Sequence, residues 1–496
     1  MIYSIMSRKS HGFFVQFFLL MGCQEILGLA SSSRFVGFDL GTSGARISVI
    51  EPHENSPGGY REVYEEAIPW DDDGTYDDAN AWMNAIETLL RGASKGIGNL
   101  ESVVSICVSG TSASCLLVNR KTLEVTRSPR MYNYDCVASA KDSQFGEEAS
   151  ALLEAHAPPR HTARARTGSL AKLLSWAKET PLDENEVLCH QSDYVSMKLM
   201  ADASPVRSDW HNCLKLGYDV REKQWPPWLV GCLKDAGIAN PVSAGGVIPL
   251  EVVSPGAPMG KIDKDVAADL GLGEDTVIVG GTTDSNAAFF AAAGTKPSFG
   301  TAVTSLGSTL AMKQLSQTYV EDADRGVYSH RFPNFENPND EAWLVGGASN
   351  VGCAILRKLE FSNDELADLS TQIDPSTDSP LNYYPLTKVG ERFPVADSNK
   401  EPILHPVPEN RKDYLHGILQ SIGDVEREGF GVLQELGAPS PSIVWTCGGG
   451  SRNDMWSQLR ERRLTEKFGD SDIKVRRAEC TEASFGAALL AAATFS

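Results

Sequence analysis

The sequence predicts an α/β protein with two large, related domains, and three observations support this. The 496 residues exceed what one hydrophobic core usually organises, so two domains are expected. From residue 35 onward, short apolar runs alternate with longer mixed segments, as strands and helices do in α/β proteins. The second half also restarts the strand, turn and strand pattern with which the first half begins.

Composition narrows the class of function. Apolar residues make up 42% of the chain and charged residues 22%, which is typical of a soluble globular protein. A net charge of −20 without a basic patch argues against nucleic-acid binding. An anionic ligand must therefore be bound locally, by a metal ion and backbone amides. The ten cysteines form no C-x-x-C pair, so they are expected to be reduced, buried thiols.

Residues 1–34 differ from the rest. Arg8 and Lys9 precede an apolar stretch, Gly12 to Gly22, that is too short to span a bilayer. We expect a removable targeting segment, secretory by its apolar stretch or organellar by its shortage of acidic residues, and no stable membrane association. The free thiols favour an organelle; the alternatives are a plain N-terminal extension and a cytoplasmic protein.

The first motif lies at Phe35–Ile50. An apolar run ends on Asp39, a turn of glycine, threonine and serine follows at 41–44, and a second alternating run begins at Arg46. This pattern predicts a β-hairpin. Its turn can present backbone N–H groups to phosphate oxygens while Asp39 holds a hydrated divalent cation. The alternative is an ordinary Asp and Gly turn between two strands.

Three further turns of this kind each adjoin a predicted strand. They are Ser109–Ser112 after the strand Val103–Val108, Thr282–Asp284 after the strand Thr276–Gly281, and Gly307–Thr309 between the strands Thr301–Leu306 and Leu310–Met312. Other expected elements are a strand at Leu116–Val118, a helix at Leu170–Lys178, a strand at Trp343–Val345 entering a helix through Gly346–Asn350, and a last helix from Thr481–Glu482 to the C-terminus. The four turns together indicate an ATP-dependent phosphotransferase.

Asp284 is the strongest catalytic candidate. It precedes a good helix former, Ser285–Ala293, which Gly294 ends. An Asp at this position is an excellent N-cap, and amides at a helix start also favour the ionised carboxylate. Such a carboxylate can accept a proton from a hydroxyl that attacks phosphorus.

Gly448–Asn453 contains three glycines between the predicted strand Val444–Cys447 and a helix. The glycines permit close approach of a flat ligand or a phosphate, although a plain strand-to-helix turn is the alternative. The clusters Ser208–Asn212 and Tyr132–Asp135 suit either a polyol site or well-bonded loops, and His190 and His211 are expected to be structural. Neither a P-loop nor a G-x-G-x-x-G motif occurs.

Residues 35–496 resemble the FGGY family of carbohydrate kinases, within the actin-like ATPase superfamily. The resemblance rests on five motifs in the expected order: Phe38–Ser43, Ser109–Ser112, Gly281–Asp284, Thr304–Thr309 and Gly448–Asn453. It implies two actin-like ATPase domains, which are ribonuclease H-like, flanking a catalytic cleft. The sugar-binding domain would comprise residues 35–281 and the nucleotide-binding domain residues 282–496.

The resemblance also implies roles for individual residues. Asp284 would be the general base, and Asp39 would contact both the sugar and Mg²⁺. Other sugar-facing residues would be Thr42, Ser43, Gly44, Ala45 and Ser112. Gly307, Ser308 and Thr309 would face the phosphates of ATP, and Gly449, Gly450, Ser451, Arg452, Asn453 and Trp343 would hold the adenosine.

Within the family, the chain is most similar to plant and cyanobacterial D-ribulose kinases described as xylulose-kinase-like. This likeness rests on Ser208–Asn212, Leu214–Asp219 and Ser451–Trp456. It implies phosphorylation of D-ribulose to D-ribulose 5-phosphate by ATP. The expected location, after removal of the N-terminal segment, is the chloroplast or another organelle. Two departures from the family pattern are one extra residue in Met131–Asp135 and one in the helix Ser169–Trp176.

Three alternatives remain open. The same chemistry could act on D-xylulose, L-ribulose or glycerol. The chain could be a sugar sensor gated by nucleotide, although such a sensor needs no general base. An actin-like ATPase or chaperone module would hydrolyse ATP regardless of sugar. The sequence leaves the oligomeric state undetermined.

Overall fold

The computed structural model describes residues 33–495 except 55, 71–74, 139–142, 203, 240, 244, 338–339 and 470–472. Its first large sheet has seven strands in the order β10-β11-β4-β1-β2-β3, with β12 paired to β4. These strands are β1 (Arg34–Leu40), β2 (Gly44–Pro52), β3 (Tyr60–Pro69), β4 (Val103–Gly110), β10 (Pro258–Lys261), β11 (Val277–Val279) and β12 (Thr282–Thr283). Helices α2 (Ala79–Ile97) and α5 (Gln191–Leu199) pack on this sheet, and α8 (Lys264–Leu270) packs against α2.

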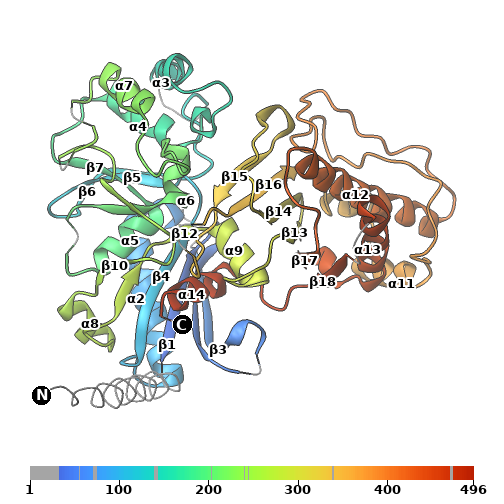
Figure 1. Ribbon diagram of the computed structural model, residues 1–496, viewed down its shortest axis with the longest axis horizontal. Helices are drawn as coiled ribbons and strands as arrows, with labels where there is room; N and C mark the ends of the chain where they lie inside the picture. The colour runs from blue at the N-terminus through green and yellow to red at the C-terminus, as the bar shows by residue number, and fades with distance from the viewer. Residues whose placement is uncertain are drawn as a thin grey trace, which may run out of the picture.

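The second large sheet has six strands in the order β15-β16-β14-β13-β17-β18. They are β13 (Thr301–Leu306), β14 (Leu310–Ser316), β15 (Tyr328–Arg331), β16 (Trp343–Ser349), β17 (Ile443–Cys447) and β18 (Lys474–Arg477). Helices α11 (Asn363–Thr371), α12 (Arg411–Glu435) and α13 (Asp454–Phe468) lie together on the outer side of this sheet (Figure 1). The α/β prediction is therefore confirmed.

The two sheets share a three-strand pattern. In the first sheet, β1 pairs antiparallel with β2 and parallel with β4. In the second, β13 pairs antiparallel with β14 and parallel with β17. The predicted repeat of the strand, turn and strand pattern is thus present, with both hairpins where the sequence placed them.

A smaller unit lies beside the first sheet, at the top left of Figure 1. Its three-stranded sheet has the order β6-β5-β7, and β8 pairs with β9 next to it. Its elements are β5 (Cys115–Asn119), β6 (Val125–Arg130), β7 (Glu186–His190), β8 (Arg207–Asp209), β9 (Glu251–Val253), α3 (Ser143–His156), α4 (Ser169–Glu179), α6 (Trp210–Cys213) and α7 (Pro227–Asp235).

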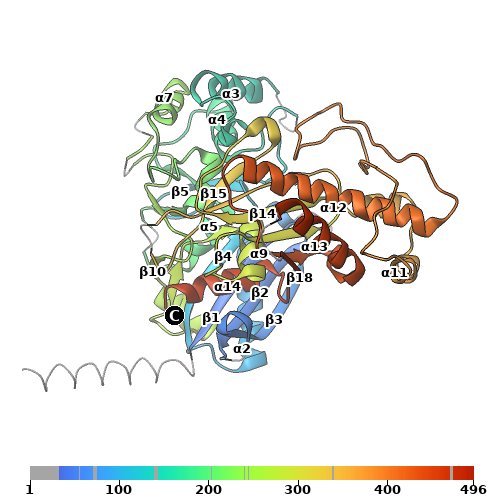
Figure 2. The ribbon, with the colours of Figure 1, turned by 45° about the vertical axis from the view of Figure 1, so that its right-hand side comes forward.

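Helices α9 (Asp284–Ala293) and α14 (Ala483–Ala493) lie side by side where the two large sheets meet (Figures 1 and 2). Glycines permit this packing. A Cβ at Gly37 of β1 would lie 2.0 Å from the Ser484 carbonyl oxygen, and one at Gly486 would lie 1.8 Å from that of Ala287. The end of the chain is therefore seated on the first sheet. The domain boundary after residue 281 stays a prediction; β12, just beyond it, pairs with the first sheet.

One predicted boundary is wrong. The strand expected to end at Val345 continues to Ser349, and the next helix, α10, spans Ala354–Lys358. A Cβ at Gly346 would lie 1.9 Å from the Met312 carbonyl oxygen of the neighbouring β14. The glycines here permit close packing of the strand and do not form a turn.

The N-terminal prediction concerns residues 1–34, of which 1–32 lie outside the described part of the chain, so the targeting segment stays a prediction. Within the described residues, no helix combines the length and the apolar content that crossing a bilayer requires.

Candidate active site

The carboxyl ends of three parallel strands, β1, β4 and β12, form one edge of the first sheet. In the register, Asp39 of β1 lies opposite Ser109 of β4, and Ser109 lies opposite Thr282 of β12. The Ser109 hydroxyl donates a 2.7 Å hydrogen bond to Asp39 Oδ1. Asp284 begins α9 directly after β12. Because neighbouring strands are about 4.8 Å apart, this edge brings Asp39 and Asp284 to one place.

Asp39 is almost fully buried, with 3% of its surface exposed. Burial raises its pKa to about 7, and the negative charge of Asp284 acts in the same direction. The hydrogen bond from Ser109 opposes this shift, as does the Arg46 guanidinium, 3.8 Å from Asp39 Oδ2. The site therefore holds a carboxylate whose negative charge is poorly compensated by the protein. A bound cation would stabilise its ionised form.

Asp284 is half-buried, and burial raises its pKa as well. The backbone N–H of Ser285 donates to Asp284 Oδ1 at 2.6 Å, and Lys313 and Lys215 add positive charge; all three lower the pKa. The capping interpretation is wrong, because the N-cap of α9 is Thr283 and Asp284 is the first helical residue. Its carboxylate accepts the N–H of the next helical residue, Ser285, instead of acting as the N-cap.

The turn after Asp39 divides into exposed and buried parts. Thr42 and Ser43 are exposed, whereas Gly44 and Ala45 are buried. A Cβ at Gly44 would lie 2.2 Å from the Ile68 carbonyl oxygen of β3. The side chains of Thr42 and Ser43 are therefore available to a ligand. Buried Ala45 offers it no side-chain surface.

Ser112 is half-buried in a loop that contacts the loop Met131–Asp135. The Ser114 hydroxyl accepts from the Tyr132 backbone N–H at 2.8 Å. The buried Lys172 Nζ donates to the carbonyl oxygens of Ala113 and Met131, at 2.8 and 2.7 Å. Lys172 belongs to α4, so the two segments that depart from the family pattern are held together by one side chain.

The Ser208–Asn212 cluster is buried throughout, which favours the interpretation as well-bonded structure over a polyol site. Asp209 accepts from the backbone N–H groups of His211 and Asn212. His211 lies 2.7 Å from the Thr282 hydroxyl through Nδ1 and 2.7 Å from the Arg331 carbonyl oxygen through Nε2. Burial lowers its pKa to about 3, so the ring is neutral. The cluster thus supports β12 through the contact between His211 and Thr282.

His190 is structural, as expected. It is fully buried, and its Nδ1 lies 2.9 Å from Asp193 Oδ2.

On the second sheet, the turn Gly307–Thr309 joins β13 and β14. Ser308 and Thr309 are exposed, while backbone bonds fix the turn: Cys353 N–H donates to the Gly307 carbonyl oxygen at 2.8 Å. A Cβ at Gly352 would lie 2.5 Å from Thr309 Cα, so the segment that follows β16 packs directly against the turn. A rigid turn with exposed backbone is suited to phosphate oxygens.

The turn Gly448–Asn453 follows β17, the neighbour of β13, so it lies beside that hairpin. Gly448 has a φ of +80°, which favours glycine, and a Cβ at Gly450 would lie 2.8 Å from Leu306 Cβ. Gly449 has open space where a Cβ would project, and Arg452 is exposed.

Two other residues of this turn stabilise its shape. The Ser451 hydroxyl donates to the Gly448 carbonyl oxygen at 2.7 Å. The Asn453 side chain caps α13, and its Nδ2 donates to the Ser370 hydroxyl at 2.8 Å. Contact with adenosine is therefore expected from Gly449, Gly450 and Arg452 rather than from these two side chains.

Trp343 does not fit the proposed adenosine site. Its side chain is fully buried and packs edge-on against Tyr319, with the Arg331 guanidinium 5.2 Å from its ring centre. A ring with no exposed surface cannot contact a nucleotide. It is the first residue of β16, as the apolar run Trp343–Val345 predicts.

Three polar side chains at this edge were not among the sequence predictions: Lys215, Lys313 and Gln191. Gln191 Oε1 accepts from both the backbone N–H and the hydroxyl of Thr111, at 3.0 Å each, while its Nε2 is buried without a partner among the described residues. A lysine directly after the predicted strand Leu310–Met312 was the available signal for Lys313. Only the fold brings Lys215 and Gln191 near Asp284 and Thr111.

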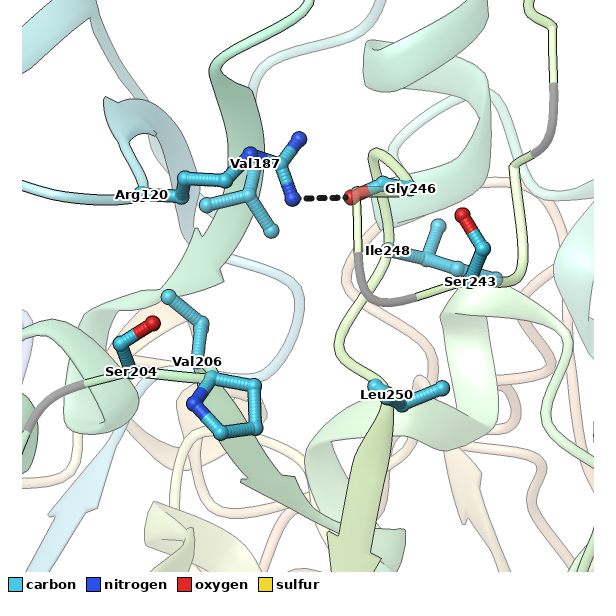
Figure 3. A pocket seen from close by; sticks show the side chains of 9 residues that line it. Arg120, Val187, Ser204, Val206, Ser243, Gly246, Ile248 and Leu250 are labelled. Atoms are coloured by element: carbon cyan, nitrogen blue, oxygen red, sulfur yellow. Dashed lines mark hydrogen bonds between the residues drawn. The ribbon is translucent and has the colours of Figure 1, made fainter.

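A small pocket lies elsewhere, between β7 and the segment before β9 (Figure 3). Arg120 crosses it and donates to the Gly246 carbonyl oxygen at 3.0 Å. Its other lining residues are Val187, Ser204, Pro205, Val206, Ser243, Ile248 and Leu250. None of the predicted site residues lines it, so it is separate from the candidate active site.

Comparisons with known proteins point to one class of enzyme, the carbohydrate kinases. Residues 302–495 match the C-terminal domain of the FGGY family of carbohydrate kinases. A xylulose kinase from Bifidobacterium adolescentis has the same fold, with a TM-score of 0.70, 18% identity and coverage of 93% of each chain. A Plasmodium falciparum glycerol kinase with ADP gives 0.72 at 14% identity, covering 93% of this chain and 90% of its own.

A gluconate kinase from Lactobacillus acidophilus gives a TM-score of 0.71 at 14% identity, covering 93% of this chain and 89% of its own. These likenesses show that the chain has the fold of these sugar kinases, as predicted. Residues 302–495 thus carry the C-terminal domain of FGGY carbohydrate kinases, and this match and the shared fold support a phosphotransferase that acts on a sugar hydroxyl.

Proposed function

We propose that the chain transfers the γ-phosphoryl group of ATP to D-ribulose, giving D-ribulose 5-phosphate. One observation supports this activity most strongly. The ends of parallel strands bring Asp39 and Asp284, the first residue of α9, to a single edge of the sheet. Burial and, less strongly, the negative charge of Asp284 raise the pKa of Asp39, and a binding-only module gains nothing from such a pair of carboxylates.

Asp284 would act as the general base. It would accept the proton of the C5 hydroxyl as the hydroxyl oxygen attacks the γ-phosphorus, and ADP would leave. Its raised pKa favours this role, because a base is most effective when its pKa lies near the working pH. Phosphoryl transfer otherwise needs its reactants in line and their charge neutralised.

The donor set fits Mg²⁺. This ion binds carboxylate oxygens, keeps several of its waters and also binds substrate phosphates, so it needs no enclosed protein site. In the part of the chain that the structure describes, no group of three or more His, Cys, Asp or Glu side chains forms a metal site. Asp39 would hold the ion through its waters, and the bound ion would neutralise phosphate charge.

The choice of D-ribulose rests on the sequence likeness at Ser208–Asn212, Leu214–Asp219 and Ser451–Trp456. Proteins of the same fold are described as xylulose, glycerol and gluconate kinases, so these acceptors are the alternatives. The loop Met131–Asp135, which carries the extra residue, adjoins the Ser112 loop and is where we expect the acceptors to be distinguished.

The test is ADP release from Mg²⁺-ATP with each acceptor in turn, for the wild type and for Asp284→Asn. We expect a strong response to D-ribulose, and we expect the variant to lose at least about 10³-fold in kcat while still binding ATP. A response to another acceptor alone would change the substrate and keep the kinase. Normal turnover by the variant would refute the assignment of the base.

A further inference from the structure

Lys313 joins the two halves of the site. It lies on β14, four residues after Thr309 of the phosphate-facing turn, opposite Gly346 of β16. Its Nζ donates to the Ser285 hydroxyl at 3.1 Å and also to Asn286 Oδ1. Ser285 and Asn286 form the first turn of α9 directly after Asp284. One side chain thus links the sheet that carries the turn to the helix start that carries the base.

The contact orients a buried group. Asn286 is fully buried, and its Nδ2 has no partner among the described residues. Its amide is therefore oriented through the bond that Oδ1 accepts from Lys313. Removing the ammonium would leave both polar ends of a buried amide unpaired, which disfavours the present conformation of this first helical turn.

Lys313 and Lys215, both half-buried, supply positive charge to Asp284. Burial lowers the pKa of each amine, and the negative charge of Asp284 opposes that shift and favours the charged form. The neighbouring rings of His211 and His330 are neutral, because burial lowers the pKa of each. Lys313 is the cation that also bonds to the helix start. Charge and geometry therefore coincide in one residue of the second sheet.

We propose that Lys313 is a positioning residue for the transfer step. It holds the first turn of α9 against β14, so that the hydroxyl activated by Asp284 and the phosphoryl group held by Gly307–Thr309 meet in line. The inference rests on the proposed function, in which Asp284 is the base. A displacement of about 1 Å in such an alignment can reduce the rate about 100-fold.

The test compares Lys313→Met, Lys313→Arg and Asn286→Ala with the wild type in sugar-dependent ADP release. We expect kcat of K313M to fall about 100-fold with the KM values for sugar and ATP changed less than about threefold. K313R should recover at least a tenth of wild-type kcat, since arginine keeps the charge and the donors. In the K313M/N286A double variant, the fall in kcat should be smaller than the product of the two single falls, because both changes break the same contact.

Lys261→Met serves as the matched control, since Lys261 is 64% exposed and pairs only with Asp275 among the described residues. Wild-type kcat in K313M, or equal losses in K313M and K313R, would overturn the inference. If K313M does not fold, the kcat and KM values of K313R and N286A test the inference in the same way. Activity of D284N would refute the proposed function instead, so the two failures are distinguishable.

Discussion

Asp39 should make the ligand-free protein less stable as the pH rises. Its pKa is raised from 3.8 to about 7 in the folded state. Below pH 3.8 the carboxyl group is protonated in both the folded and the unfolded state, and it has no effect on stability. Between 3.8 and 7 the unfolded state releases the proton and the folded state retains it, so the free energy of unfolding decreases with pH.

The magnitude follows from the size of the shift. One pKa unit corresponds to about 1.4 kcal/mol, so burial of Asp39 costs up to about 4 kcal/mol above pH 7. Asp39→Asn removes this cost and still accepts the hydrogen bond from Ser109. It loses the 3.8 Å ion pair with Arg46, whose side chain is 37% exposed, and such a pair contributes less than about 1 kcal/mol.

We therefore expect D39N to be more stable than the wild type and inactive. The gain at pH 8 should exceed the gain at pH 5 by about 2.6 kcal/mol, or roughly 2–3 °C in melting temperature for a chain of this length. The assay is thermal unfolding of both proteins at the two pH values, with chelator and without nucleotide. Asp275→Asn is the control, because Asp275 is 94% exposed and should show no such gain.

Equal effects of D39N at pH 5 and pH 8, or a destabilised D39N at pH 8, would refute the reasoning. Either result would mean that Asp39 is not buried as an uncompensated carboxylate.

Two further predictions concern the framework. Gly486→Ala should lower stability by about 3 kcal/mol or more, because its Cβ would lie 1.8 Å from the Ala287 carbonyl oxygen. Gly431→Ala, with 3.6 Å to its nearest neighbour, should be neutral or stabilising in the same melting assay; equal effects would contradict the packing argument. Glu426→Gln should cost about 3–5 kcal/mol in urea unfolding, since Glu426 and Arg460 form a 2.6 Å ion pair with both side chains 1% exposed. Replacing both by apolar residues should recover most of that loss, and a fully stable E426Q would show that the pair is not needed.

Much of the framework could be predicted from the sequence, because hairpins and strand-to-helix turns are local. Alternating apolar residues next to Gly, Ser and Thr turns placed the Asp39 and Gly307–Thr309 hairpins correctly and the start of α9 to within one residue. The same local reasoning failed at Gly346. A glycine that makes a turn and a glycine that permits close strand packing look alike in a sequence.

The sequence by itself determined the α/β class and the repeated hairpin, and it singled out the carboxylates of Asp39 and Asp284. Only the tertiary structure decided which side chains meet. It buried Trp343 and the Ser208–Asn212 cluster, and it brought Lys215 and Lys313 to Asp284. Lys313 on β14 and its partner Asn286 on α9 are 27 residues apart in the sequence. Such contacts arise from packing between distant elements, for which no local pattern exists.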